Sequence, residues 1–190
     1  MTLRVVIADD EAVIRMGLRT MLEERGYRVV GEAGDGERLV DLVGKLRPDL
    51  VFLDIKMPGM DGLTAAERLA ETARVPVILL TAYSDRSLVE RARRAGVMGY
   101  LMKPLREADL APAIELALAR FSDLEALTEE VTDLRETLET RKLVERAKGL
   151  LMRRLGLSEE EAYRRIQTAS RASRRSMQEI AREILAGNLP

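Results

Sequence analysis

The chain has 190 residues, of which 46% are apolar and 33% are charged, and its formal net charge is −1. This composition is that of a soluble globular protein, and the length suffices for two small domains. The sequence contains neither cysteine nor histidine, which excludes disulfides, thiolate chemistry, a histidine base and the common zinc sites. We see no signal peptide and no apolar run long enough to span a membrane, so we expect a cytoplasmic protein.

The small net charge conceals three regions of different character. Residues 1–120 carry 18 basic and 19 acidic side chains, residues 121–140 carry one basic and seven acidic ones, and residues 141–182 carry 12 basic and five acidic ones. Segments that differ so much in charge are expected to have different tasks. We therefore divide the chain into a domain at 1–120, an acidic linker helix at 121–140 and a basic region at 141–190.

Predicted strands and helices alternate through the first 120 residues. Short apolar runs predict strands at 3–8, 28–32, 50–53, 75–80 and 98–102. Apolar residues at helical spacing predict helices at 12–25, 37–46, 63–72 and 87–95, and a further helix begins near Glu107. This alternation predicts a five-stranded parallel sheet with helices on both faces, an α/β fold.

One long helix is expected to follow. From residue 106 to residue 155 only Pro112, in the first turns, and Gly149 depart from a helical composition, so we predict a helix of about 50 residues. Gly149 is unfavourable in mid-helix, and we expect another segment to approach it closely. Five apolar residues with 3-4-3-4 spacing form a heptad seam suited to a homodimer: Leu124, Leu127, Val131, Leu134 and Leu138.

Two shorter helices complete a predicted three-helix bundle. Ser158 with Glu161, and Ser176 with Glu179, have the spacing of capping boxes that begin helices. In the first of these helices Tyr163 lies on the apolar stripe, and this spacing favours a place in the core.

Polar residues follow four of the five predicted strands: Asp9 and Asp10, Asp54, Thr81, and Lys103. An aspartate after a strand is often only a turn former or a helix cap. Because the carboxyl ends of parallel strands meet at one edge, where α/β proteins bind ligands, five such groups on four strands favour a functional site.

The chemistry of these groups is that of a phosphoryl site. Three neighbouring carboxylates repel one another unless a cation joins them, and oxygen ligands suit Mg²⁺. The Lys103 ammonium and the Thr81 hydroxyl would stabilise the oxygens of a phosphoryl group in transfer. The remaining carboxylate, Asp54, would be the nucleophile and would form an acyl phosphate.

These residues resemble a response-regulator receiver domain over residues 3 to about 120. The resemblance is carried by Asp9-Asp10, by Asp54 with Met57-Pro58-Gly59-Met60-Asp61-Gly62, by Thr81-Ala82 and by Lys103-Pro104. It implies a flavodoxin-like, doubly wound fold and phosphorylation of Asp54 by a sensor histidine kinase.

The resemblance also implies roles for the neighbours of Asp54. Mg²⁺ would be bound by Asp9, Asp10, Asp54 and the backbone carbonyl of Lys56. Thr81 and Tyr100 would change their side-chain positions when Asp54 is phosphorylated. Lys56 and Tyr83 occupy the positions that flank the attacking water in receivers. Both are bulky and neither orients water, so we expect slow autodephosphorylation, with a half-life of minutes to hours, and no other enzymatic activity.

The basic region resembles an ANTAR domain from about residue 125 to residue 186. The resemblance is carried by the run 141–152, with Ala147-Lys148-Gly149 at its centre, and by Ser158 to Tyr163, whereas residues 170–173 depart from the family pattern. It implies binding to paired RNA hairpins in nascent transcripts and transcription antitermination. The expected RNA contacts are Lys148, Arg153, Arg154, Arg174 and Arg175.

Other interpretations of the basic region remain open at this stage. Its charge is also that of a solvated helix face, of a DNA-binding response regulator or of a module that docks an acidic protein. The last predicted helix, 176–186, carries Arg182 as its single base, which is unfavourable for reading a DNA groove. Salt-dependent binding to RNA hairpins but not to duplex DNA would separate these alternatives.

Overall fold

The structure is a computed structural model that describes residues 2–82 and 86–187, without the side chains of 86–89. The chain divides into two compact units, Met1–Leu124 and Glu125–Pro190. Each unit has its own apolar core, and each is described separately below.

The first unit is built on a five-stranded sheet, which confirms the predicted fold class. The strands pair in parallel in the order β2-β1-β3-β4-β5, with bounds β1 Arg4–Ala8, β2 Arg28–Ala33, β3 Leu50–Asp54, β4 Val77–Thr81 and β5 Gly99–Met102. Strand β4 begins two residues later than predicted. Pro76 precedes it, and proline cannot donate a hydrogen bond to a neighbouring strand.

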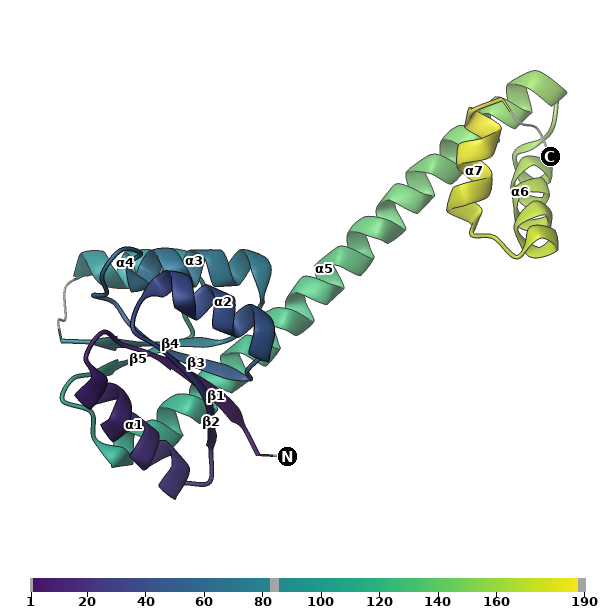
Figure 1. Cartoon of the computed structure of the whole chain (residues 1–190). Helices are drawn as coiled ribbons and strands as arrows, with labels where there is room; N and C mark the ends of the chain where they lie inside the picture. The colour runs from purple at the N-terminus through teal and green to yellow at the C-terminus, as the bar shows by residue number, and fades with distance from the viewer. Residues whose placement is uncertain (1, 83–85, 188–190) are drawn as a thin grey trace. The chain divides into compact units, whose positions relative to one another are not determined.

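Helices cover both faces of this sheet (Figure 1). Helices α2 (Gly36–Leu46), α3 (Gly62–Thr72) and α4 (Arg86–Arg94) lie on one face, while α1 (Ala12–Glu24) and the start of α5 (Glu107–Leu155) lie on the other. Alternate residues of β3 belong to the two apolar cores. Val51 and Leu53 pack on the side of α2 and α3, and Leu50 and Phe52 pack on the side of α1. Burial on both faces explains why this strand is apolar throughout.

Helix α5 is continuous from Glu107 to Leu155, which confirms the predicted long helix, and Pro112 lies in its second turn. Residues 122–139 are exposed on every side. The five seam residues are therefore exposed too, by 45% to 57% of their surfaces.

The second unit packs the end of α5 against α6 (Glu159–Ser173) and α7 (Met177–Leu185). Both predicted capping boxes are present, at Ser158 with Glu161 and at Ser176 with Glu179. The core contains Val144, Ala147 and Leu151 from α5, Ala162 and Ile166 from α6, and Ile180, Ala181 and Ile184 from α7.

The prediction that Tyr163 lies in this core is wrong. Tyr163 is 43% exposed, and α6 contributes Ala162 and Ile166 to the core instead. Among the described helices, none is both long enough and apolar enough to cross a membrane.

Candidate functional site

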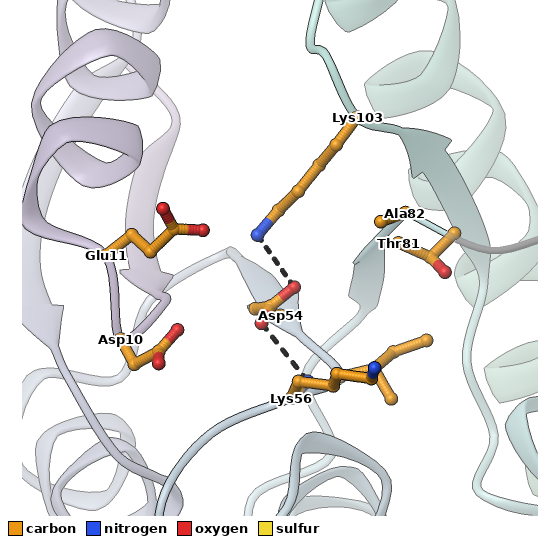
Figure 2. A pocket seen from close by; sticks show the side chains of 8 residues that line it. Asp10, Glu11, Asp54, Lys56, Thr81, Ala82 and Lys103 are labelled. Atoms are coloured by element: carbon orange, nitrogen blue, oxygen red, sulfur yellow. Dashed lines mark hydrogen bonds and ion pairs between the residues drawn. The ribbon is translucent and has the colours of Figure 1, made fainter.

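The carboxyl edge of the sheet gathers the polar residues predicted from the sequence. Asp54 is the last residue of the central strand β3, Thr81 is the last residue of β4, and Asp9 and Lys103 directly follow β1 and β5. Since β3 pairs with β1 on one side and with β4 on the other, these strand ends lie next to one another. Figure 2 shows Asp10 and Thr81 on opposite sides of Asp54, with the Lys103 side chain reaching toward it.

Lys103 is the cation at the centre of this edge. Its ammonium nitrogen lies 2.7 Å from Asp9 Oδ2 and 2.9 Å from Asp54 Oδ1. Asp9 is fully buried and Asp54 is 6% exposed, so these charges interact where water screens them weakly. The contact with Asp9 is an ion pair without hydrogen-bond geometry, and Asp9 Oδ2 has no hydrogen-bond donor among the described residues.

The second oxygen of Asp54 is held by the backbone. The amide of Lys56 donates a 3.1 Å hydrogen bond to Asp54 Oδ2, so the carboxylate is fixed from two sides. A hollow of about 380 Å³ opens beside it, lined by Asp10, Glu11, Asp54, Ile55, Lys56, Thr81, Ala82 and Lys103 (Figure 2). Asp54, Thr81 and Lys103 therefore border one hollow.

Burial and charge shift the pKa values of the central pair. Burial raises the pKa of Asp54, and the neighbouring Lys103 ammonium opposes this shift without cancelling it. Burial on its own would lower the pKa of Lys103, but the Asp9 and Asp54 carboxylates outweigh it and the pKa is raised. Lys103 is therefore a cation throughout the physiological range.

The carboxylates of Asp9, Asp10 and Asp54 fit a divalent cation. One oxygen from each of them lies within 4.8 Å of the other two. Lys103 offsets one of the three negative charges, which leaves two when all three groups are ionised. Hard oxygen ligands with this residual charge suit Mg²⁺.

Arg15, on α1, holds the turn that contains Asp9 and Asp10, which we call the acidic turn. Arg15 was not singled out from the sequence. Its Nη1 donates to the carbonyl oxygens of Asp9, at 2.7 Å, and Asp10, at 3.2 Å. Its Nε lies 3.4 Å from Glu32 Oε2 on β2, and Glu32 also accepts a 2.6 Å hydrogen bond from Arg19. Every helix carries arginines, and only the fold brings this one to the turn.

Gly62 fixes the other side of the site. A Cβ atom at this position would collide with the carbonyl oxygen of Asp54, and the Gly62 amide donates a 2.9 Å hydrogen bond to Ile55 O. In the sequence Gly62 is the last residue of the motif that follows Asp54. The structure adds that no side chain fits between α3 and the end of β3.

The remaining predicted residues of the edge lie as follows. Tyr100 is on β5 and is 62% exposed, whereas Thr81 is 7% exposed. Lys56 lines the hollow and its side chain is exposed. Tyr83 lies outside the described residues.

The five predicted RNA contacts lie in two different settings. Arg153, Arg154 and Arg174 are exposed, and none of them forms an ion pair with a described residue. Arg175 pairs with Glu183 at 2.7 Å.

Lys148 differs from the arginines because it is buried, with 6% exposure. Its ammonium lies 2.9 Å from Glu145 and 2.7 Å from Glu159, and these carboxylates raise its pKa. Lys148 is one of the five residues predicted to contact RNA, and in the structure it joins α5 to the start of α6.

Comparison with known proteins assigns both parts of the chain. Residues 5–115 match the response regulator receiver domain and residues 132–185 match the ANTAR domain. The receiver match covers more than half of the chain, so this protein belongs to the response regulators, with an ANTAR domain after its receiver. Both resemblances noted in the sequence are thereby confirmed.

Similarity to one relative spans nearly the whole chain. The transcriptional regulatory protein PdtaR of Mycobacterium tuberculosis is 53% identical over 182 residues, which cover 96% of this chain and 89% of that protein. The positive alginate biosynthesis regulatory protein of Pseudomonas aeruginosa is 40% identical over 117 residues, 60% of this chain and 47% of that protein.

Solved structures resemble the first unit. The signal receiver domain of a modulated diguanylate cyclase from Desulfovibrio desulfuricans has a TM-score of 0.60 and 35% identity, and the match covers 64% of this chain and 98% of that chain. The CheX–CheY complex with BeF3 and Mg²⁺ from Borrelia burgdorferi has a TM-score of 0.56 and 28% identity, covering 59% and 86%.

Proposed function

We propose that this chain is a phosphorylation-controlled transcription antiterminator, in which a sensor histidine kinase phosphorylates Asp54 and the C-terminal region binds RNA hairpins. The observation that carries the proposal is the convergence of Asp9, Asp10, Asp54 and Lys103 at one sheet edge, on a chain that also carries an ANTAR domain. Residues 1–120 would receive the phosphoryl group, 121–140 would link and dimerise, and 141–190 would bind RNA.

The proposed chemistry is one phosphoryl transfer per activation. An Asp54 oxygen attacks the phosphorus of the kinase phosphohistidine, an oxygen–phosphorus bond forms, and the imidazole nitrogen leaves. The Lys103 ammonium, 2.9 Å from Asp54, stabilises the negative charge on the transferred oxygens. Thr81 donates to the phosphoryl group once it is in place.

Mg²⁺ is the proposed cofactor, bound by Asp9, Asp10, Asp54 and the Lys56 carbonyl. When bound, it neutralises the phosphoryl oxygens and allows an anion to enter an acidic pocket. The similarity to a chain of the CheX–CheY complex that contains BeF3 and Mg²⁺ supports this choice of metal.

The proposed switch couples the pocket to the long helix. Thr81 turns toward the phosphoryl group, and Tyr100, exposed on the adjacent strand β5, moves with it. This change promotes a homodimer through the exposed seam at Leu124, Leu127, Val131, Leu134 and Leu138. A seam of about two heptads is marginal by itself, which suits a dimer that forms on phosphorylation. Two linked bundles would then bind two hairpins in one nascent transcript, in the cytoplasm.

The decisive experiment is a gel shift with a paired-hairpin RNA that the wild-type protein selects from a pool with randomised loops. Wild type and Asp54→Asn are each compared with and without acetyl phosphate and Mg²⁺, and duplex DNA is the competitor. We expect phosphorylation to tighten binding by wild type and to leave Asp54→Asn unchanged. If wild type selects no RNA, or if duplex DNA competes equally, the RNA-binding function is wrong.

The lifetime of phosphorylated Asp54 and the dimerisation of the protein are tested separately. Phospho-Asp54 should decay at neutral pH with a half-life of minutes to hours, and decay within seconds would contradict the role given to Lys56 and Tyr83. Sedimentation should detect a monomer without acetyl phosphate and a dimer with it, at micromolar protein. An unchanged mass would contradict phosphorylation-driven dimerisation.

A further inference from the structure

One face of α5 combines basic side chains with an unexplained glycine. Lys142, Arg146, Gly149 and Arg153 follow one another at intervals of four, three and four residues, which places them on the same side of the helix. The buried residues Val144, Ala147 and Leu151 mark the opposite side, where α6 and α7 pack. The basic face therefore points away from the core of its own unit.

Internal packing gives no reason for the glycine. A Cβ atom on Gly149 would meet one atom within 4 Å, Arg153 Nη1 at 3.6 Å, which is ordinary van der Waals contact. The backbone there is helical, so alanine fits and is the better helix former. The close approach that we expected from another segment of this chain is absent among the described residues.

The cations that flank Gly149 indicate that an anionic partner, and not another segment of this chain, approaches the glycine. Arg146 and Arg153 form no ion pair with any described residue, and Lys142 pairs with the exposed Glu139 of its own helix, at 2.8 Å. Along the helix the three cations span about 16 Å. Two other open helix glycines, Gly17 and Gly44, do not have a cation three or four residues away on both sides.

We propose that this face of α5 binds the phosphate backbone of an RNA hairpin stem, and that Gly149 is the point of closest approach. The proposal rests on the proposed function and deepens it, because it locates the contact with RNA. Arg146 and Arg153 bind phosphates on either side of Gly149, and the missing side chain lets the RNA backbone lie against the helix. Lys148, one residue away, is a positioning residue that holds α6 in place through Glu159.

A second copy of α5 is the competing occupant. Gly149 lies near the continuation of the heptad seam, and glycine also permits close helix pairing. In a symmetric parallel dimer, however, Lys142, Arg146 and Arg153 of both chains would face each other and repel. Charge complementarity therefore favours an anionic partner.

The experiment measures binding of the full-length phosphorylated protein to the selected paired-hairpin RNA by fluorescence anisotropy. Gly149→Ala is compared with Gly17→Ala, which also fills open space in a helix. We expect Gly149→Ala to weaken RNA binding by about tenfold, because an added methyl disrupts a close contact. Gly17→Ala should leave binding unchanged. Both variants should unfold at a slightly higher temperature than wild type, which excludes misfolding as the cause of weaker binding.

Salt dependence tests the cations of this face. Arg146→Gln and Arg153→Gln should each reduce the slope of log affinity against log salt by about 0.7 to 0.9, whereas Arg68→Gln, on α3, should not change it.

The possible results distinguish the proposed RNA contact at Gly149 from the proposed RNA-binding function of the whole protein. If wild type binds the RNA and Gly149→Ala binds equally well, the inference is wrong and the proposed function stands. If Gly149→Ala changes the sedimenting mass and not the RNA affinity of the dimer, the face belongs to a self-association surface and the inference is likewise overturned. If wild type binds no RNA, both fail.

Discussion

The sheet edge around Asp54 and the basic face of α5 carry their charges in opposite ways. At the edge, Asp9 and Asp54 are buried and share one ammonium, and backbone groups hold the surrounding loops. On α5, Arg146 and Arg153 are exposed and have no ion-pair partner among the described residues. The edge is organised before any ligand arrives, whereas the cations of the face await the RNA that we propose as their partner.

This difference predicts two kinds of mutational effect. A buried, pre-organised site couples chemistry to folding, so damage to its supports lowers both stability and activity. An exposed docking face contributes little to folding, so changes there affect partner binding alone. Four experiments follow, ordered by the expected effect on the stability of the protein.

Gly62→Ala tests how tightly the edge is built. The added methyl collides with Asp54 O, so we expect the free energy of unfolding to fall by about 3 kcal/mol or more. Phosphorylation of the folded fraction should fall with it. Urea unfolding measures the first effect and acetyl-phosphate labelling the second. Gly44→Ala, in open space on α2, is the control and should stabilise by up to about 1 kcal/mol. Equal stability of the two variants would contradict a tightly packed edge.

Arg15→Gln tests the support of the acidic turn. It removes two hydrogen bonds to the Asp9 and Asp10 carbonyls, and we expect a loss of about 1–2 kcal/mol in unfolding free energy and weaker Mg²⁺ binding. Arg19→Gln is the matched control, because Arg19 also pairs with Glu32 and makes no hydrogen bond to the turn. Calorimetric Mg²⁺ titration compares them. Equal Mg²⁺ affinity in both variants would exclude a positioning role for Arg15.

Asp61→Ala tests the cap of α3, where the Asp61 side chain accepts a hydrogen bond from the Thr64 amide. Burial alone would raise the pKa of Asp61, but hydrogen bonds from Thr64 and the nearby Arg91 lower it below 3.8. A pKa that is lower in the folded state stabilises the fold at higher pH and ceases to do so as the pH falls through it. We expect a loss of about 1 kcal/mol at pH 7 that shrinks below pH 4. A loss of equal size at pH 3 and pH 7 in urea unfolding would contradict this origin.

Leu134→Gln tests the exposed seam in the second unit. The side chain is 57% exposed, so the unfolding free energy of the unphosphorylated monomer should change by less than about 0.5 kcal/mol. The dimer that we propose for the phosphorylated protein should be lost in sedimentation. Thr132→Gln, off the heptad positions, is the control and should leave the dimer intact. Dimerisation of Leu134→Gln like wild type would exclude the seam.

The sequence predicts which residues meet at the edge of the sheet, but it does not predict the residues that hold them in place. Apolar runs locate the strand ends, and parallel pairing brings Asp9, Asp54 and Lys103 together whatever the details of packing. The contact between Arg15 on α1 and the turn after β1 depends on where a helix lies over the sheet. No local pattern encodes that placement.

The helical unit shows the corresponding limit for side chains at the rim of a core. Periodicity locates the apolar face of α5 and α6 but not its width. Lys148 follows Ala147 in the chain and is only 6% exposed, with its ammonium beside Glu145 and Glu159, so it is buried where exposure was expected. Tyr163 shows the reverse, with its ring 6.0 Å from that ammonium and open to solvent.

The exposure of residues 122–139 of α5 has a consequence for hydrogen exchange. Every residue of this stretch is exposed and none belongs to the described apolar cores, so opening it disrupts neither of the cores at its two ends. In the free protein these amides should exchange faster than those of β3 or of α5 near Ala147. A partner that covers the stretch would slow them, so their exchange rates report assembly residue by residue.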